Sequence, residues 1–184
     1  MSKFVLIDGH SILNRAFYGV PIFTNSEGLH TNAVFGFLNI MFKIIDSKQP
    51  DYMAVAFDVH QPTFRHEMFK DYKGTRKPMM EELREQVPVI KELLQKMNIT
   101  TVELPGYEAD DVIGTLSKKG EKAGMEVDVI SGDRDLLQLA SDHITICIPK
   151  TKKGQTTVEE YNTEGVRKLY KVTPTEFIDV KALM

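Results

Sequence analysis

The sequence predicts an α/β fold with a mainly parallel central sheet flanked by helices. At 184 residues, with 42% hydrophobic residues, the chain is long enough for one domain with a sizeable core. Short apolar runs alternate with longer segments whose apolar residues recur at helical spacing. Strands separated by a helix join through right-handed crossovers and run parallel, so their carboxyl ends meet at one edge of the sheet.

Five apolar runs predict the strands, at residues 3–7, 52–57, 100–104, 127–131 and 144–148. A basic turn over residues 150–154 and a short added strand over 156–159 follow the fifth run. Helical spacing predicts helices at residues 11–17, 32–47 and 80–97, from the stretch 106–111 to about 124, from 136 onward, and from 174 to 184.

Local signals place the ends of several helices. Ser11 is the expected cap of the first helix, which brings Asn14 and Arg15 close to the end of the first strand. Pro88 lacks a backbone donor and should kink or split the third predicted helix. A capping box over residues 173–176, with proline at the first helical position, predicts the start of the last helix.

Acidic residues gather where the predicted strands end. They are Asp8, Asp58, Glu108, Asp110, Asp111, Asp133 and Asp135. In an open α/β sheet, ligands bind beyond the carboxyl ends of the strands, so these acids are candidates for one site. The helix macrodipole alone also favours acids in a first turn, which is the purely structural explanation for Asp110 and Asp111. Setting the seven aside changes the formal net charge from −3 to +4, so a basic surface is expected around them.

Carboxylates in this number predict a divalent metal site. Mg²⁺ and Mn²⁺ prefer hard oxygen ligands. Two such ions roughly 4 Å apart can activate water and stabilise the leaving oxygen of a phosphodiester. The sequence has no Cys/His cluster with zinc spacing and no Gly-x-x-x-x-Gly-Lys loop. On a regular helix Glu108 and Asp110 point different ways, so both reach one ion only if Glu108 precedes the helix or waters bridge the gap.

The window 65–77 combines basic and aromatic residues. Five basic residues, Arg65, Lys70, Lys73, Arg76 and Lys77, stand against two acids, and Phe64, Phe69 and Tyr72 accompany them. Cationic groups bind phosphates and aromatic rings stack on unpaired bases, which predicts a grip for single-stranded nucleic acid. The alternative is a solvated surface segment whose aromatic residues pack locally.

The remaining composition favours a cytoplasmic protein. The single Cys147 lies in an apolar run and is expected to be a buried thiol, so no disulfide framework is available. The apolar run near the N-terminus is too short for a signal peptide, and no stretch approaches membrane-spanning length.

Seven motifs together resemble the N-terminal 5′-3′ exonuclease domain of bacterial DNA polymerase I, a branch of the flap endonuclease family with a PIN-like α/β fold. They are Val5–Gly9, Arg15–Phe17, Ala56–Asp58, Phe64–Arg65, Tyr72–Arg76, Gly106–Leu116 and Gly132–Asp135. The resemblance covers residues 1–184 and implies a helical arch at about residues 60–82. It implies a structure-specific bacterial 5′ nuclease that trims DNA flaps and RNA primers with two Mg²⁺ or Mn²⁺ ions, in replication and repair.

The resemblance also assigns roles. Asp8, Asp58, Glu108 and Asp110 match the carboxylates of the first metal, with Asp111 beside them, and Asp133 and Asp135 match half of the second set. Lys73 and Arg76 match the basic residues at the base of the arch, where the scissile phosphate is held. Arg15, Arg65, Tyr72 and Lys77 complete the DNA-binding set, although Tyr72 could equally pack the arch.

One departure from the family pattern affects the expected activity. In the family, the segment resembling residues 177–184 is followed by a Gly-Asp-x-x-Asp motif and a helical element that grips duplex DNA, and neither is in this sequence. We therefore expect a complete first metal site, a weaker second site, and reduced or no activity without those parts. The expected parent protein is a 5′ nuclease to which a polymerase domain can be attached.

Three other functions stay open on the sequence alone. The chain could be a non-catalytic nucleic-acid-binding fragment, or a PIN-like ribonuclease. Asp8 could also be a phosphatase-type nucleophile, but such sites usually have a second acid two residues on, where His10 stands.

Overall fold

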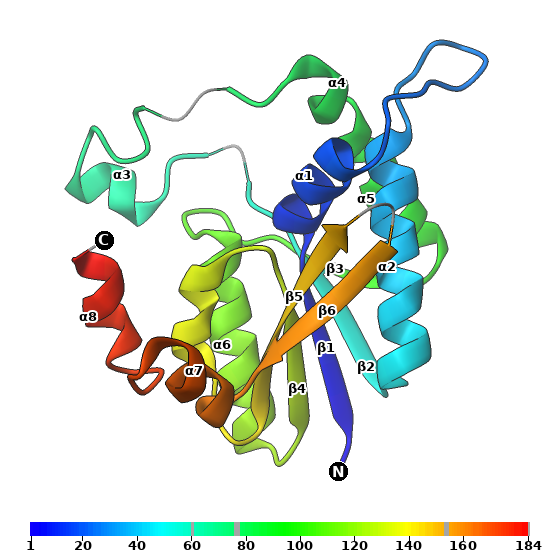
Figure 1. The fold of residues 1–184 in the computed structure, drawn as a ribbon. Helices are drawn as coiled ribbons and strands as arrows, with labels where there is room; N and C mark the ends of the chain where they lie inside the picture. Colours follow the sequence, from blue (N-terminus) through cyan, green and yellow to red (C-terminus); the bar gives the residue numbers. More distant parts are fainter. Residues whose placement is uncertain (60, 76–77, 153–154, 184) are drawn as a thin grey trace.

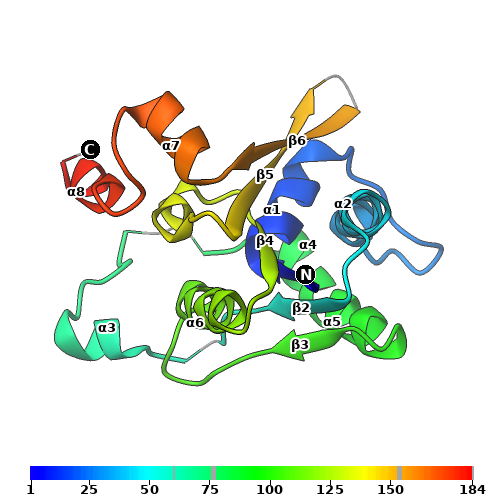
Figure 2. The same ribbon diagram turned by 90° about the horizontal axis from the view of Figure 1, so that it is seen from below.

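A six-stranded sheet forms the centre of the computed structural model, between two layers of helices (Figures 1 and 2). The structure describes residues 1–59, 61–75, 78–152 and 155–183, and for residues 151, 152, 155 and 156 only the backbone. The strand order is β3-β2-β1-β4-β5-β6, and only the β5–β6 pair is antiparallel. The strands are β1 (Lys3–Asp8), β2 (Tyr52–Ala56), β3 (Thr100–Val102), β4 (Glu126–Ile130), β5 (Ile144–Lys152) and β6 (Gln155–Tyr161). The predicted mainly parallel α/β sheet is confirmed.

Alternating side chains of the strands build a core on each face of the sheet. Val5 and Ile7 face one core, whereas Leu6 faces the other. The first core is covered by α1 (Gly9–Gly19), α2 (Asn32–Lys48) and α5 (Gln86–Lys96). The second is covered by α6 (Ala109–Lys122), the 3₁₀ helix η1 (Arg134–Leu139), α7 (Thr163–Tyr170) and α8 (Phe177–Ala182). Cys147 is fully buried in the first core, as predicted.

The strand register brings the predicted acids to one edge of the sheet. Asp8, the last residue of β1, pairs with Ala56 of β2, and the preceding Ile7 pairs with Ile130 of β4. Asp58 and Asp133 each follow the end of their strand within three residues. The sheet topology alone therefore brings together the acids at the carboxyl ends of β1, β2 and β4.

The chain between β2 and α5 crosses above this edge, with α3 (Phe64–Met68) and α4 (Glu81–Arg84) at its two ends (Figure 1). We call residues 60–82 the arch segment. Among its described residues, only α3 and the first residues of α4 are helical, so most of the segment consists of turns and irregular backbone.

Buried polar side chains fix the end of the arch segment. The predicted helix 80–97 is split at Glu85, three residues before Pro88, which lies in the first turn of α5 where its missing N–H breaks no helical bond. Gln86 is fully buried, and its Oε1 accepts hydrogen bonds from the backbone N–H groups of Ala33 at 2.8 Å and Val34 at 3.2 Å. A side chain of α5 thus caps the N-terminus of α2, which has no cap of its own at Thr31.

Several boundaries differ from the prediction. Asp8, and not Ser11, caps α1, because its Oδ1 accepts the Ser11 N–H at 3.1 Å and the helix begins at Gly9. β3 is shorter than predicted, and the helix predicted from residue 136 is the 3₁₀ helix η1. The β5–β6 pair is longer than predicted, because antiparallel pairing continues through residues 150–152, where a turn was expected. Residues 153 and 154 of that predicted turn lie outside the described residues.

The C-terminal helix follows its predicted capping box. The Thr173 N–H donates to Glu176 Oε2 at 2.8 Å, and the Glu176 N–H donates to Thr173 Oγ1 at 3.2 Å. Regular helix nevertheless begins only at Phe177, three residues after the predicted start at Pro174, and ends at Ala182, so the predicted helix 174–184 was too long at its start. None of the helices in the described residues combines the length and apolar character needed to cross a membrane.

Candidate functional site

The carboxyl edge of the sheet opens into a cavity of about 620 Å³, which we call the acidic cavity. Five of the seven predicted acids line it: Asp8, Asp58, Glu108, Asp110 and Asp133. Lys73, Met80 and Leu83 line it from the arch segment and α4. The fold therefore places five carboxylates from separate parts of the chain around one space, with a cation from the arch segment beside them.

Asp8 is held in position from both sides. It is 5% exposed, Ser131 Oγ donates to its Oδ2 at 2.8 Å, and the Ser11 N–H donates to its Oδ1 at 3.1 Å. The next residue must be small, because a Cβ on Gly9 would lie 2.4 Å from the ring of Phe57. Close packing at this strand end thus fixes where the Asp8 carboxylate points.

The start of α6 joins two more acids to the cavity. Gly106, with φ +84°, makes the turn before the helix, and Glu108 is the N-cap residue with extended backbone. Glu108 therefore precedes the helix, which is the condition under which it and Asp110 can face the same space. Asp58 Oδ1 accepts the Ala109 N–H at 2.8 Å, so the acid after β2 is tied directly to this helix start.

Crowding shifts the acid–base properties of the cavity. Burial, followed by the charges of Asp58 and Asp133, raises the pKa of Asp8 to about 6, against the lowering effect of its hydrogen bonds. Burial and the charges of Asp8 and Asp133, with smaller effects of the other neighbouring acids, raise the pKa of Asp110 to about 7. The carboxylates repel one another, and a bound cation would relieve that repulsion.

The carboxylates of the acidic cavity are the type of ligand that a hard divalent cation prefers, but their present positions do not form a complete metal site. The acidic side chains of the cavity offer only oxygen ligands, which Mg²⁺ and Mn²⁺ prefer. Within the described part of the chain, no three acidic, histidine or cysteine side chains stand where they could hold an ion. Both oxygens of Glu108 already have protein partners, because Lys73 Nζ lies 2.6 Å from Oε1 and the Tyr72 hydroxyl donates to Oε2 at 3.2 Å. A metal ion at Glu108 would compete with Lys73 for this carboxylate.

Two of the predicted metal-binding acids lie outside the acidic cavity. Asp111 receives two hydrogen bonds from the Arg65 guanidinium, at 2.7 and 2.8 Å, and does not line the cavity. The Asp135 side chain is 49% exposed and its Oδ1 lies 2.7 Å from Lys181 Nζ of α8. Adjacent acids in the sequence therefore have different surroundings.

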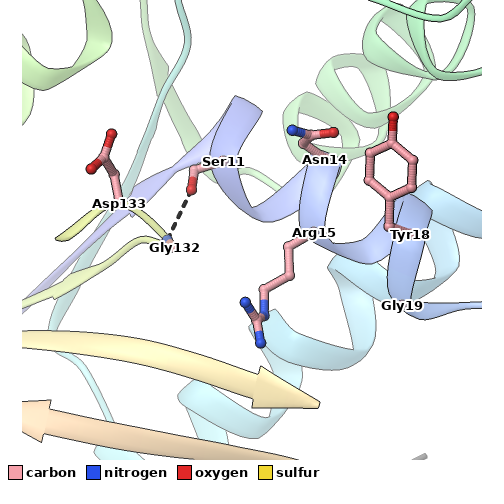
Figure 3. Close-up of a pocket in the computed structure, with 7 residues that line it drawn as sticks. All are labelled: Ser11, Asn14, Arg15, Tyr18, Gly19, Gly132 and Asp133. Carbon is pink, nitrogen blue, oxygen red and sulfur yellow. Dashed lines mark hydrogen bonds between the residues drawn. The ribbon is translucent and has the colours of Figure 1, made fainter. Parts of the chain in front are cut away.

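A second cavity of about 580 Å³ adjoins the first and shares Ser11, Asn14, Tyr18 and Asp133 with it. In Figure 3, Asn14 and Tyr18 project from one side of α1 and Arg15 from the other. Ser11 Oγ accepts the Gly132 N–H at 2.8 Å, which joins α1 to the loop after β4 (Figure 3). The Arg15 Nε is buried, and among the described residues it has no hydrogen-bond partner. Burial lowers the pKa of this guanidinium.

The other predicted DNA-binding residues lie in the arch segment. Tyr72 packs its ring edge-on against His66 at 5.3 Å between centroids, in addition to its contact with Glu108. Lys73 has left-handed backbone, with φ 57°, and lies directly before Gly74. Arg76 and Lys77 lie outside the described residues.

Sequence reasoning missed the role of Ser131. Its hydroxyl donates to Asp8 and accepts the Asp133 N–H at 3.0 Å, so it connects acids that follow two neighbouring strands. The available signal was a serine at the end of a buried strand, directly before Gly132 and Asp133. A buried carboxylate such as Asp8 needs hydrogen-bond donors, and this serine lies where one is required.

The family described as 5′-3′ exonuclease, N-terminal resolvase-like domain, matches residues 3–171. The chain belongs to this family. DNA polymerase I of Bacillus caldotenax is 52% identical to it over 182 residues, which are 99% of this chain and 20% of that protein. DNA polymerase I of Bacillus subtilis is 51% identical over 182 residues, with the same shares. The chain thus spans about 20% of the length of these relatives.

The solved structures resemble this 5′-3′ exonuclease domain in fold. The bacteriophage T5 D15 flap endonuclease, in a complex with DNA and metal ions, superposes with a TM-score of 0.74 at 23% identity. The match covers 99% of this chain and 66% of that one. The predicted resemblance to the 5′-3′ exonuclease family and the predicted fold are both confirmed.

The raised pKa values predict an unusual dependence of stability on pH. A carboxyl group whose folded pKa exceeds the unfolded value of 3.8 binds its proton more tightly in the folded state, so its contribution to stability is lost as pH rises through about 6 to 7. With a chelator present at pH 8, Asp110→Asn should therefore raise the free energy of unfolding by about 2 kcal/mol, and this gain should disappear near pH 4. Urea denaturation at the two pH values measures it.

Asp111→Asn is the matched control in the same helix turn. Arg65 lowers the pKa of Asp111, so stability from this group is present at neutral pH and lost as pH falls through the lowered pKa. Asp111→Asn should destabilise the protein at pH 8. A destabilising effect of Asp110→Asn at pH 8 would contradict this account of the acidic cavity.

Proposed function

We propose that this domain hydrolyses phosphodiester bonds at 5′ ends and 5′ flaps of DNA with bound Mg²⁺ or Mn²⁺. The observation that carries the proposal is the convergence of five carboxylates on one cavity beneath a basic, aromatic arch segment. The DNA polymerase I relatives and the phage flap endonuclease, described with DNA and metal ions, support the same function.

Asp8, Asp58, Glu108 and Asp110 would hold the first ion, and Asp133 would contribute to a second. Bound ions would supply an activated water and stabilise the leaving oxygen. The chain itself orients the ligands: Ser131 and the Ser11 N–H hold Asp8, and the Ala109 N–H holds Asp58. Asp135, whose Oδ1 lies 2.7 Å from Lys181 Nζ, would join the second ion in competition with that lysine. We expect the second site to be the weaker one, because residues 1–184 carry only half of the family's second set of carboxylates.

Cations around the cavity would hold the DNA backbone. The Arg15 guanidinium lines the second cavity, which adjoins the acidic cavity, and its Nε has no hydrogen-bond partner in the described residues; a phosphate would supply one. Lys73 now neutralises Glu108 and would be freed to contact the scissile phosphate when Glu108 binds an ion. Arg76 and Lys77, in the same arch segment, are proposed to contact the strand that passes beneath it.

The DNA polymerase I relatives support a proposal for the biological role. We propose that the parent protein acts in the bacterial cytoplasm during replication and repair, where it removes 5′ flaps and RNA primers, together with a polymerase domain such as the relatives carry. The DNA-gripping helical part and the further second-metal carboxylates of the family would complete this activity outside residues 1–184.

The direct test is cleavage of a labelled 5′-flap DNA by the 184-residue chain in Mg²⁺ and in Mn²⁺. We expect slow cleavage that a chelator abolishes and that Asp110→Asn reduces at least about 100-fold, because the ions activate the water. Asp46→Asn, an exposed acid on α2, is the control and should leave the rate unchanged. A matching RNA substrate tests for ribonuclease activity.

Two results would contradict the proposal. Cleavage that persists in the chelator would exclude metal-dependent catalysis. Absence of cleavage in a folded sample that still binds the flap would show that these residues alone form a binding fragment.

Arg15→Gln should weaken flap-DNA binding across all sequences. Loss of one phosphate contact should also reduce the slope of log affinity against log salt concentration by about 1. Fluorescence anisotropy at several salt concentrations, in Ca²⁺ to suppress cleavage, measures both quantities. Arg167→Gln on the exposed face of α7 is the control, and an equal effect of the two substitutions would show that Arg15 has no specific role.

A further inference from the structure

Two neighbouring acids at the start of α6 face different surroundings. Asp110 lines the acidic cavity, whereas Asp111 is turned to Arg65 of α3 and does not line it. Burial, followed by the charges of the neighbouring acids, raises the pKa of Asp110, whereas Arg65 lowers the pKa of Asp111. The negative charge of Asp111 is therefore already compensated by the protein.

Both oxygens of Asp111 are engaged. Arg65 Nη1 donates to Oδ2 at 2.7 Å and Nη2 donates to Oδ1 at 2.8 Å, the parallel geometry of a guanidinium–carboxylate pair. Oδ2 also accepts the Glu108 N–H at 3.0 Å, which completes a capping box at the N-terminus of α6. A metal ion at Asp111 would compete with these hydrogen bonds and with the charge of Arg65.

Arg65 belongs to the part of the arch segment that rests on α6. The preceding Phe64 N–H donates to the Gly106 carbonyl at 3.1 Å, and the Phe64 ring lies 5.7 Å from the Tyr107 ring between centroids. The Arg65 guanidinium lies 4.5 Å from the centroid of the Phe64 ring. Hydrogen bonds, ring packing and an ion pair thus attach this part of the arch segment to the turn before α6.

Lys73, eight residues after Arg65 in the same arch segment, lines the acidic cavity. Lys73 Nζ reaches Glu108 Oε1 at 2.6 Å from a left-handed backbone conformation that non-glycine residues rarely adopt. Such a conformation persists only when the surroundings fix it. The bidentate Arg65–Asp111 pair, whose side chains are 31% and 24% exposed, attaches α3 to α6 and could do so, and Arg65 Nη1 also lies 3.7 Å from Glu108 Oε2.

We propose that Arg65 and Asp111 form a positioning pair that sets Lys73 over the acidic cavity, and that Asp111 is not a metal ligand. This inference rests on the proposed nuclease function, in which Lys73 contacts the DNA. It assigns different tasks to the two adjacent acids: Asp110 faces the ions, and Asp111 fixes the arch segment that holds the substrate.

The first test separates positioning from metal binding in the 184-residue chain without DNA. Asp111→Asn keeps an acceptor for the Glu108 N–H but removes the charge that pairs with Arg65. We expect calorimetry to show Mn²⁺ affinity within about twofold of the wild type for Asp111→Asn, and at least about tenfold weaker for Asp110→Asn. A loss for Asp111→Asn equal to that for Asp110→Asn would identify Asp111 as a ligand and overturn the proposal.

The second test measures how firmly the arch segment is attached. Chymotrypsin can cut after Phe69, which is 61% exposed, and neither substitution removes that cleavage position. Arg65→Gln and Asp111→Asn should each speed this cleavage about fivefold, and the double variant should be no faster than either single variant. Additive effects of the two substitutions would show that the residues do not act as a pair.

The third test asks whether the pair acts through Lys73. Arg65→Gln should weaken flap-DNA binding about fivefold in the wild type but less than about twofold in a Lys73→Ala background. Equal losses in both backgrounds would mean that Arg65 contacts DNA itself or only stabilises the fold, and would overturn the proposal. If the wild type does not bind flap DNA, the proposed function fails, whereas the metal and proteolysis results still test the pair.

Discussion

Repulsion among carboxylates at the end of the parallel strands is the constraint on which the rest of the site depends. Parallel pairing of β1 with β2 and β4 brings their following acids together, whatever charge they carry. Burial then makes the repulsion stronger, because less water screens it. Burial is the larger cause of the raised pKa values of Asp8 and Asp110, and the charges of the neighbouring acids add to it. A bound divalent cation would offset both effects.

Hydrogen-bond donors and one positive charge from the surrounding residues reduce this repulsion but do not remove it. Ser131 and the first N–H groups of α1 and α6 donate to Asp8 and Asp58, so these carboxylates are oriented before any ion binds. Lys73 supplies a positive charge from the arch segment. These contacts let the acids lie close together in the folded protein, and the excess of negative charge that they leave would attract a cation.

The sequence predicted the collection of acids because topology determines it. An apolar run that ends in an acid, repeated along an α/β pattern, is sufficient to place Asp8, Asp58 and Asp133 at one edge, as the strand register shows. Composition alone identified the basic and aromatic window 65–77, and the family resemblance added the interpretation of residues 60–82 as an arch. Helical spacing also indicated that Glu108 and Asp110 could reach one ion only if Glu108 preceded the helix or waters bridged the gap. Glu108 is the N-cap residue of α6, so it does precede the helix.

Side-chain orientation could not be predicted in the same way. Asp110 and Asp111 are identical in type and adjacent in sequence, and only the position of Arg65 in space distinguishes them. Asp135 was grouped with Asp133 by spacing, but Lys181 of the last helix pairs with it. Ser11 was expected to cap α1 with its side chain, whereas Asp8 takes that position and Ser11 instead joins α1 to Gly132. The contacts of Asp111, Asp135 and Ser11 with Arg65, Lys181 and Gly132 all join residues far apart in the sequence.

The measurement that tests the central claim most directly is proton release on Mn²⁺ binding, by calorimetry in buffers of different ionisation enthalpy. Because Asp8 and Asp110 have pKa values of about 6 and 7, binding at pH 6 to 6.5 should release about one proton, and binding at pH 9 should release almost none. Asp110→Asn should remove most of the release. Binding at pH 6 to 6.5 without proton release, or no binding to the folded chain, would contradict the claim that these crowded carboxylates form a cation site.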